Sequence, residues 1–432
     1  MDTSSIRIEL VSEKLITPSS PTPEHLRHYK LSFLDQLVTT KYIPVTLFYT
    51  NTSISSSEKL SSILEESLSK LLSFYYPYAG KIVDNIYVDC NDRGALFKEV
   101  RIKTPMCETL ANEFSNTQEL PGSGFCCKEP SEEGPLAVVI LSHFECGGIA
   151  ITLALTHKLG DGYTTCKFYS DWAQLARTSI TNNPPLLTGS SLLQPKDDPF
   201  TPNLYDMGNN HHLSFIRLRF DLENIKLLKD IASSKSDVND PTSFEVVAAL
   251  VNKCATIAGR SNIPSSSSSL FDPFTIYIPM NLRKLIDPAV ENLVGNFLSF
   301  VLVDVSSEDE LELPKLVSKI RKEKLKHMEK YQGKNNVEIL GEIKEEARKF
   351  PMDSKLRLAT SFSAVKLYDI DFGWGRPARV TLEAIRSNNY FVMLSAPDKG
   401  GIDVIASLDP SIALKFKTNK ALLQFSSVDP TS

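Results

Sequence analysis

The spacing of apolar side chains predicts alternating strands and helices in the first 180 residues. Leucines recur every three or four positions across residues 58–74, which is the period of an amphipathic helix. Two apolar runs, 136–144 and 149–156, flank the turn-forming segment 145–148, and this arrangement predicts a β-hairpin. Two shorter apolar runs predict strands at 6–15 and 45–49.

Polar residues mark the starts of two further predicted helices. Asp161 stands at the N-cap of a helix expected at 163–177. Thr242 and Glu245 have the spacing of a capping box, which opens an apolar helix to about Ala258. The remaining elements expected in the second half are strands at 213–222, 274–279, 295–305 and 391–394 and a basic helix at 314–332.

Residues 181–213 interrupt this alternation. They contain five prolines among many asparagine, serine, threonine and aspartate residues, a composition typical of a long irregular connection. We therefore expect an N-terminal domain at 1–180, a crossover linker at 181–213 and a C-terminal domain at 214–432. Each domain is long enough to bury a sizeable core.

Composition narrows the possible functions. The 432-residue chain is 42% hydrophobic and 23% charged, with a net charge of −5. This gives no reason to expect nucleic acid or a membrane as a partner, and no apolar run reaches the roughly 18 residues of a transmembrane helix. The N-terminus lacks the apolar core of a secretory signal. Seven cysteines without a CxxC pair favour reduced thiols, so we expect a cytoplasmic protein without bound metal.

His157 is the first candidate for chemistry. It follows a predicted strand, and imidazole is the side chain best suited to accept a proton near neutral pH. Gly160 and Gly162 allow the nearby backbone to approach a ligand closely. Asp161, four residues after the histidine, could orient the imidazole or simply cap the next helix. Taken alone, such a pattern is more often explained by a structural histidine bonded to the backbone.

The second candidate is the segment 371–375, Asp-Phe-Gly-Trp-Gly. Two glycines flank Trp374, which predicts a sharply bent backbone. The indole N–H is a single hydrogen-bond donor on an otherwise apolar body. Taken alone, this segment is most simply a buried loop whose tryptophan fills a gap in the core.

The two patterns together are specific. Their order and separation resemble those of the plant BAHD acyltransferases, a CoA-dependent family, and in particular its vinorine synthase-like branch. Segments of the same type extend the resemblance over nearly the whole chain: 18–23, 34–36, 76–81, 244–250, 281–283 and 295–296. The resemblance implies an α/β fold of two chloramphenicol acetyltransferase-like domains with mixed sheets, an active-site tunnel between them and a monomeric protein.

The resemblance also implies roles for individual residues. His157 would be the general base that deprotonates the acceptor, and the Trp374 indole would stabilise the oxyanion. Asp371 would be catalytic with them, or its carboxylate would instead position the Trp374 loop. Asp161 would turn away from the channel and pair with Arg283, so both are expected to position His157.

Acyl-CoA is the co-substrate that the resemblance implies, with no permanently bound cofactor. Thr360 and Ser361 match family positions that bond the pantetheine arm, and Asn296 is a weaker candidate for cofactor binding. The basic helix at 314–332 could meet the 3′-phosphate, although a solvated charged face is the simpler explanation for any single lysine.

We therefore expect an O-acyltransferase that moves an acetyl group from acetyl-CoA to a hydroxyl of a plant alkaloid, terpenoid or acylsugar. An N-acyltransferase, an enzyme for longer or aromatic acyl-CoA, and a catalytically silent small-molecule binder remain as alternatives. Ala364 stands where shikimate-type relatives carry arginine, which disfavours a carboxylate-bearing acceptor. Gly162 is expected to leave space beside the motif for a larger acceptor or donor.

Overall fold

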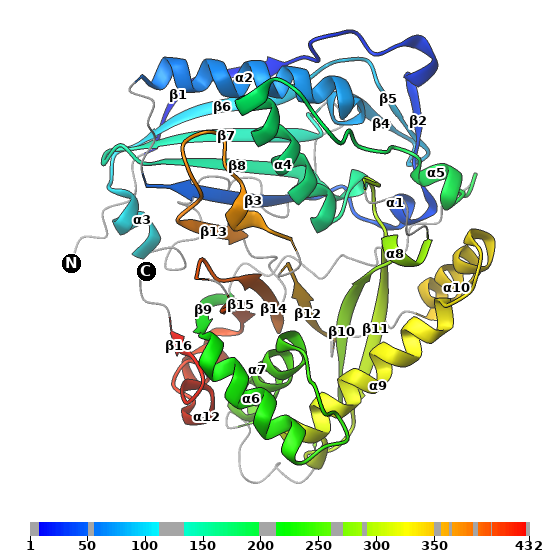
Figure 1. The fold of residues 1–432 in the computed structure, drawn as a ribbon, viewed down its shortest axis with the longest axis vertical. Helices are drawn as coiled ribbons and strands as arrows, with labels where there is room; N and C mark the ends of the chain where they lie inside the picture. Colours follow the sequence, from blue (N-terminus) through cyan, green and yellow to red (C-terminus); the bar gives the residue numbers. More distant parts are fainter. Residues whose placement is uncertain are drawn as a thin grey trace.

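The structure is a computed structural model, and its two α/β halves lie one above the other (Figure 1). Each half contains one large β-sheet, and a three-stranded sheet completes the first half. The structure describes residues 8–50, 56–111, 134–197, 213–260, 271–286, 292–349, 356–362, 365–382, 388–398 and 400–428.

The large sheet of the first half has six strands in the order β1-β6-β7-β8-β3-β13. Strands β7 and β8 form the predicted antiparallel hairpin, and β6 runs parallel to β7, so the sheet is mixed. Its strands are β1 (Ile8–Ile16), β3 (Tyr42–Tyr49), β6 (Ala95–Ile102), β7 (Ala137–Phe144), β8 (Ile149–Thr156) and β13 (Arg379–Leu382). The small sheet consists of β2 (His28–Lys30), β4 (Lys81–Val83) and β5 (Tyr87–Asp89).

The sheet of the second half has seven strands in the order β11-β10-β12-β14-β15-β9-β16. Strand β12 runs parallel to both of its neighbours, whereas the other pairs are antiparallel. The strands are β9 (Ser214–Phe220), β10 (Phe274–Asn281), β11 (Leu298–Val305), β12 (Leu356–Ser361), β14 (Tyr390–Ser395), β15 (Ile402–Leu408) and β16 (Ser427–Val428). This sheet is therefore mixed as well.

One strand crosses from the second half of the sequence into the first sheet. Strand β13 pairs antiparallel with β3, with Val380 opposite Leu47. The buried Arg217 of β9 donates to the Val380 carbonyl and to Asp403 of β15, each at 3.2 Å. A boundary at residue 214 assigns β13 to the C-terminal domain, but the sheet pairing joins it to the N-terminal one. The two halves thus share a sheet as well as a core.

Helices α2 and α4 pack on the first sheet, and α6, α7, α9 and α11 pack on the second (Figure 1). The described helices are α1 (Phe33–Leu37), α2 (Ser57–Phe74), α3 (Met106–Ala111), α4 (Gly162–Thr178), α5 (Gly189–Leu192), α6 (Leu222–Ser234), α7 (Ser243–Arg260), α8 (Arg283–Ile286), α9 (Leu313–Tyr331), α10 (Asn336–Lys349), α11 (Pro410–Phe416) and α12 (Lys420–Leu423). Within the described ranges, none of them combines the length and apolar character needed to cross a membrane.

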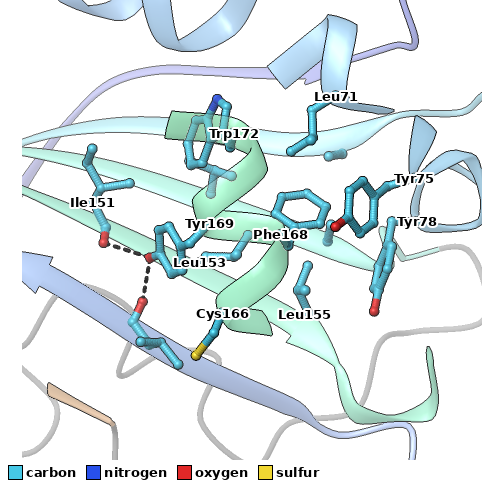
Figure 2. Close-up of a cluster of buried hydrophobic side chains, with 14 of the residues drawn as sticks. Leu71, Tyr75, Tyr78, Ile151, Leu153, Leu155, Cys166, Phe168, Tyr169 and Trp172 are labelled. Atoms are coloured by element: carbon cyan, nitrogen blue, oxygen red, sulfur yellow. Dashed lines mark hydrogen bonds between the residues drawn. The ribbon is translucent and has the colours of Figure 1, made fainter. Parts of the chain in front are cut away.

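The core of the first half fixes α4 against the sheet and against α2 (Figure 2). The Tyr169 hydroxyl donates to the carbonyls of Val45 in β3 and Ile151 in β8, at 2.8 and 2.9 Å. The buried Trp172 indole donates to the Leu64 carbonyl of α2 at 3.2 Å. Large aromatic bodies whose polar tips are bonded stabilise a core strongly. Because α4 follows β8 closely in the chain, its start is held at the end of that strand.

The second core lies on the face of the C-terminal sheet that α6, α7, α9 and α11 cover. The predicted capping box begins α7: the Thr242 amide donates to Glu245 Oε2 at 2.9 Å, and the Glu245 amide donates to Thr242 Oγ1 at 3.3 Å. Side chains on the opposite face of the sheet, such as Leu358 and Val392, join the core of the first half. The C-terminal sheet is therefore buried on both faces.

The structure confirms the main predicted elements and shifts some boundaries. The helices expected at 58–74 and 163–177 are α2 and α4. The Asp161 side chain accepts the Thr164 amide, so it is the expected N-cap. The strand expected at 213–222 ends at Phe220, and α6, which the sequence pattern did not reveal, begins two residues later.

The strand expected at 295–305 begins only at Leu298. Gly295 has a φ of +134°, which does not belong to an extended strand. The Phe297 amide donates to the Asp161 carboxylate at 3.1 Å instead of to a neighbouring strand. These first residues therefore form a bend that serves the site described below.

Candidate active site

His157 lies at the exit of β8, in the first turn after the strand. It opens the short 3-10 helix His157–Leu159, and its backbone amide donates to the Lys41 carbonyl at 2.9 Å. The residue after Lys41, Tyr42, begins β3 and pairs with Thr156 of β8. Backbone pairing therefore fixes where the imidazole is attached, and its side chain is half-buried.

Asn296 gives the imidazole a defined orientation and protonation. His157 Nδ1 and Asn296 Oδ1 are 3.1 Å apart. The Asn296 Nδ2 group faces acceptors, the Asp35 carboxylate and the His157 carbonyl, each at 2.9 Å. An amide N–H₂ donates and an amide oxygen accepts, so the oxygen faces the ring and Nδ1 carries the proton. In the neutral imidazole the basic lone pair is then on Nε2.

Burial lowers the pKa of His157 below its usual value, because the charged imidazolium loses hydration. A hydrogen bond to the residue's own backbone and the charge of Asp161 act in the opposite direction but do not cancel the burial. The net shift keeps the imidazole neutral near pH 7. A neutral histidine with its proton on Nδ1 is the form that a general base using Nε2 requires.

Asp161 and Arg283 form a buried, bidentate ion pair. Arg283 Nη1 and Nη2 donate to the two carboxylate oxygens at 2.7 and 3.0 Å, and neither residue is more than 4% exposed. The Thr164 and Phe297 amides donate to the same carboxylate at 3.0 and 3.1 Å. Burial alone would raise the pKa of Asp161, but Arg283 and these amides hold it below its usual value. The carboxylate is thus engaged by groups other than the His157 imidazole.

The segment 371–375 is a tight loop stabilised by its own aspartate. Asp371 Oδ1 accepts from the amides of Gly373 and Gly375 at 2.7 and 2.9 Å. Both glycines have positive φ, +111° and +104°, which other residues rarely adopt. Burial would raise the pKa of Asp371, but the two amides bring it below its usual value. These contacts favour loop positioning over catalysis as the role of Asp371.

Trp374 lies in an aromatic cluster. Its ring stacks on Phe372 with 5.4 Å between centroids and meets Tyr49 edge-on at 6.1 Å. The Tyr49 hydroxyl donates to the Ile370 carbonyl at 3.1 Å, which ties the loop to β3. The indole nitrogen is buried and has no hydrogen-bond partner among the described residues. Trp374 is half-buried and packs against the core, whereas Gly373 and Gly375 are exposed, so the loop is not the buried one that the structural alternative expected.

Strand β3 separates Trp374 from His157. Trp374 contacts Tyr49, the last residue of β3, whereas His157 follows the strand end that pairs with Tyr42, the first residue of β3. The two tyrosines are seven residues apart, which at about 3.4 Å per residue is about 24 Å.

Helix α4 gives a second, independent separation. Asp161 caps its start, and Gly373 packs against Arg177, sixteen residues further along the helix. At about 1.5 Å per residue, this distance is also about 24 Å. An oxyanion donor must lie about 3 Å from the oxyanion. This geometry argues against the oxyanion role expected for Trp374, because its loop lies at the far end of α4 from His157.

The end of β12 reaches the start of α4. Thr360 and Ser361 are the last residues of β12, the first half-buried and the second exposed. The next residue, Phe362, places its ring against Gly162: a Cβ on Gly162 would lie 2.3 Å from that ring. Phe362 thus fills the space expected beside Gly162, and that expectation is wrong. Ala364 lies outside the described residues.

Known proteins resemble this chain over almost its whole length. A family model described as the Transferase family matches residues 6–423. The chain belongs to the BAHD acyltransferase family. It is 36% identical to acylsugar acyltransferase 3 of Solanum lycopersicum over 441 residues, which cover 97% of each chain. It is 34% identical to deacetylvindoline O-acetyltransferase of Catharanthus roseus over 438 residues, which cover 98% of each chain.

The fold of this BAHD acyltransferase is also that of a solved relative. The crystal structure of vinorine synthase matches it with a TM-score of 0.81 and 28% sequence identity. The match covers 99% of this chain and 100% of that chain. The expected α/β fold with mixed sheets is thereby confirmed.

The basic helix α9 of this BAHD acyltransferase is largely paired with acids of the same chain. Arg321 and Lys324 donate to the Glu245 carboxylate at 2.7 and 3.0 Å, and Lys319 donates to Glu310 at 2.6 Å. Burial would raise the pKa of Glu245, but Arg321 and its other donors lower it to about 2. These ion pairs favour a solvated, internally balanced face over a site for the CoA 3′-phosphate.

Two residues near His157 contribute in ways that the sequence did not reveal. Asn296 was expected to bind the cofactor, whereas in the structure its amide contacts His157 and Asp35. Asp35 was not a candidate at all. Its signal is a carboxylate inside the apolar stretch 31–38, three residues after a serine, because Ser32 and Asp35 form the capping box of α1.

Proposed function

We propose that this BAHD acyltransferase moves an acetyl group from acetyl-CoA to a hydroxyl of a plant alkaloid, terpenoid or partly acylated sugar. The observation that carries the proposal is the hydrogen bond between His157 Nδ1 and Asn296, because it leaves Nε2 as the basic nitrogen. The names of two relatives, an acylsugar acyltransferase and an O-acetyltransferase, support the acceptor class and the acetyl donor.

His157 is the general base of the proposed reaction. Nε2 takes the hydroxyl proton while the acceptor oxygen attacks the thioester carbonyl, and a tetrahedral oxyanion forms. The C–S bond then breaks, the CoA sulfur takes the proton from Nε2, and the acetyl ester leaves. The Nδ1–H bond to Asn296 holds the ring while the imidazolium forms and disappears. No enzyme nucleophile is needed, because a thioester is already activated and both substrates can be held together.

Other residues support this reaction without taking the proton. The Asp161–Arg283 pair holds the turn between β8 and α4 that carries His157. Thr360 and Ser361 are proposed to bind the pantetheine arm of CoA, since their strand end lies beside the start of α4. The loop at 371–375 has no part in the chemical step.

A panel of donors and acceptors tests the proposal. The purified protein is incubated with acetyl-CoA and with longer aliphatic and aromatic acyl-CoA, each paired with plant alcohols and amines, and the product mass is measured. We expect an acetyl ester to have the highest kcat/KM. His157→Ala is the control: it should abolish product formation, while CoA should still raise its melting temperature.

Three results would contradict parts of the proposal. An amide product, or a longer acyl product with a higher kcat/KM, would replace the proposed acceptor or donor. Wild-type turnover in His157→Ala would remove the general base. No product with any pair of substrates, combined with thermal protection by CoA, would favour a silent binder.

A further inference from the structure

Asp35 is a buried acid in the hydrogen-bond network of His157 that the proposed reaction does not use. It lies in α1 and is 1% exposed. Its Oδ2 accepts from the amide and the hydroxyl of Ser32 at 2.9 and 2.7 Å. Its Oδ1 accepts from the backbone amide and the side-chain Nδ2 of Asn296 at 3.0 and 2.9 Å. The carboxylate therefore joins α1 of the first half to the bend before β11.

The surroundings of Asp35 suit a charged carboxylate. Three of the four groups bonded to it are N–H donors, which can bond only to an accepting oxygen. Burial raises the pKa of Asp35 above its usual value, and the bonds from Ser32 and Asn296 offset only part of that rise. A buried carboxylate is costly unless its bonds are made, so it strongly constrains the donors around it.

We propose that Asp35 is a positioning residue for His157 and acts through Asn296, an inference that rests on the proposed function. The carboxylate draws Nδ2 of Asn296 toward itself and thereby turns Oδ1 toward the imidazole. If the amide were reversed, its oxygen would face the carboxylate and its N–H₂ would face Nδ1. Nδ1 would then have to accept, the proton would move to Nε2, and the base would be lost.

The charge of Asp35 distinguishes it from the other acceptors of the amide. The carbonyls of His157 and Lys158 also face Asn296 Nδ2, at 2.9 and 3.3 Å. They are neutral, and a hydrogen bond to a charged acceptor is about twice as strong as one to a neutral acceptor. Asp161 cannot replace Asp35, because its carboxylate is bonded to Arg283 and to backbone amides.

Asp35→Asn tests the proposal, with Asp171→Asn as the matched control. Both changes replace a buried carboxylate by an amide of the same size. Asp171 accepts from Tyr75 and Lys167 at 2.7 and 2.9 Å and lies ten residues beyond Asp161. We expect Asp35→Asn to lower kcat by about 10- to 100-fold with KM changed less than about threefold, and Asp171→Asn to keep kcat within about twofold. Equal effects of the two changes would overturn the proposal.

The position of the His157 proton is a second readout, which a merely structural role would not move. Nitrogen-15 NMR distinguishes protonated from unprotonated ring nitrogens, and His157→Ala identifies the relevant signals among the seven histidines. In the wild type we expect the proton on Nδ1. In Asp35→Asn we expect a fraction of the molecules to carry it on Nε2. An unchanged tautomer in a variant with lower kcat would overturn the proposal.

Asn296→Ala keeps the proposal testable if Asp35→Asn does not fold. It should lower kcat as much as Asp35→Asn does. Where both fold, adding Asp35→Asn to Asn296→Ala should lower kcat by less than a further factor of about two, because the two residues act in series. Wild-type kcat in Asn296→Ala would overturn the proposal. A wild-type kcat in His157→Ala would instead contradict the proposed function, so the two proposals fail in different experiments.

Discussion

The two motifs by which the sequence resembles its family have opposite surroundings in the structure. His157 and Asp161 lie at the start of α4 among buried charged and amide groups. The loop at 371–375 lies at the other end of α4, where Trp374 joins a cluster of aromatic rings. The first region fixes the proton on an imidazole, whereas the second fixes the shape of a loop. Two equally recognisable motifs thus have different surroundings, and only their contacts in the folded chain distinguish them.

The two regions also differ in what a substitution leaves behind. In the first region, removing Arg283 leaves the Asp161 carboxylate buried without its cation. In the second, Asp371 bonds mainly within its own loop. The rings around Trp374 are held by apolar contacts between aromatic surfaces and not by ion pairs. Substitutions in the first region should therefore change activity and stability strongly, and those in the second should change mainly local stability.

The largest effect is expected for Arg283→Ala. Removing one partner of a buried ion pair lowers the free energy of unfolding by about 3–5 kcal/mol, and the turn that carries His157 loses its support. Arg376→Ala, directly after the second motif, is the control: its ion pair with Asp369 is exposed and should contribute less than about 1 kcal/mol. Urea denaturation measures both. Similar losses of unfolding free energy in the two variants would contradict the proposed difference between the two regions.

The pH dependence of activity should follow the first motif alone. Burial places the pKa of His157 below its usual value of about 6.5, and Nε2 is protonated below that pKa. We expect kcat/KM to fall about tenfold per pH unit on the acid side and to level off above this pKa. The pH profile of Trp374→Phe should be the same. An acid limb well above pH 6.5 would argue for a different base.

Gly162→Ala should have an intermediate effect, because a Cβ there would lie 2.3 Å from the Phe362 ring. Overpacking of this kind costs about 1–3 kcal/mol and would displace β12 from the start of α4. Gly341→Ala in α10 is the control, since a Cβ there meets nothing within 4 Å and should stabilise its helix by about 0.5–1 kcal/mol. The melting temperature and kcat/KM are measured for both variants. If Gly162→Ala is tolerated as well as Gly341→Ala, the contact between Gly162 and Phe362 does not position β12.

The smallest effect is expected for Trp374→Phe. A phenyl ring can still stack on Phe372, and the indole nitrogen has no hydrogen-bond partner to lose among the described residues. We expect a stability loss of about 1–2 kcal/mol and a kcat within about twofold of wild type. Loss of an oxyanion donor would instead lower kcat by about 100-fold or more. A fall in kcat of that size in a fully folded Trp374→Phe variant would show that Trp374 takes part in the chemical step.

Local patterns in the sequence predict much of the secondary structure. The leucine period at 58–74, the hairpin and the Asp161 cap depend on neighbouring residues, which the sequence shows directly. The place of β13 does not follow from such patterns, because its four residues pair with β3 from the far end of the chain. Only the packing of both halves decides which sheet so short a strand joins.

In the candidate site, too, contacts between residues far apart in the sequence could not be predicted from local patterns. Asp161 and Arg283 are 122 residues apart, and it was the family resemblance rather than a local pattern that indicated their contact. The position of Trp374 could not be predicted, because membership in a motif does not state which end of α4 the loop contacts. The contacts of Asn296 could not be predicted, because they depend on partners from two other segments, Asp35 and His157. These contacts exist only in the folded chain.

The central claim is that only the first motif takes part in the chemical step. The most direct measurement is the single-turnover rate of acyl transfer in His157→Ala and Trp374→Phe, with the same acyl-CoA and acceptor and with melting temperatures as a check on folding. The rate should fall by at least about 100-fold in His157→Ala and by less than about twofold in Trp374→Phe. An equal fall in both variants, or a fall in Trp374→Phe alone, would contradict the claim.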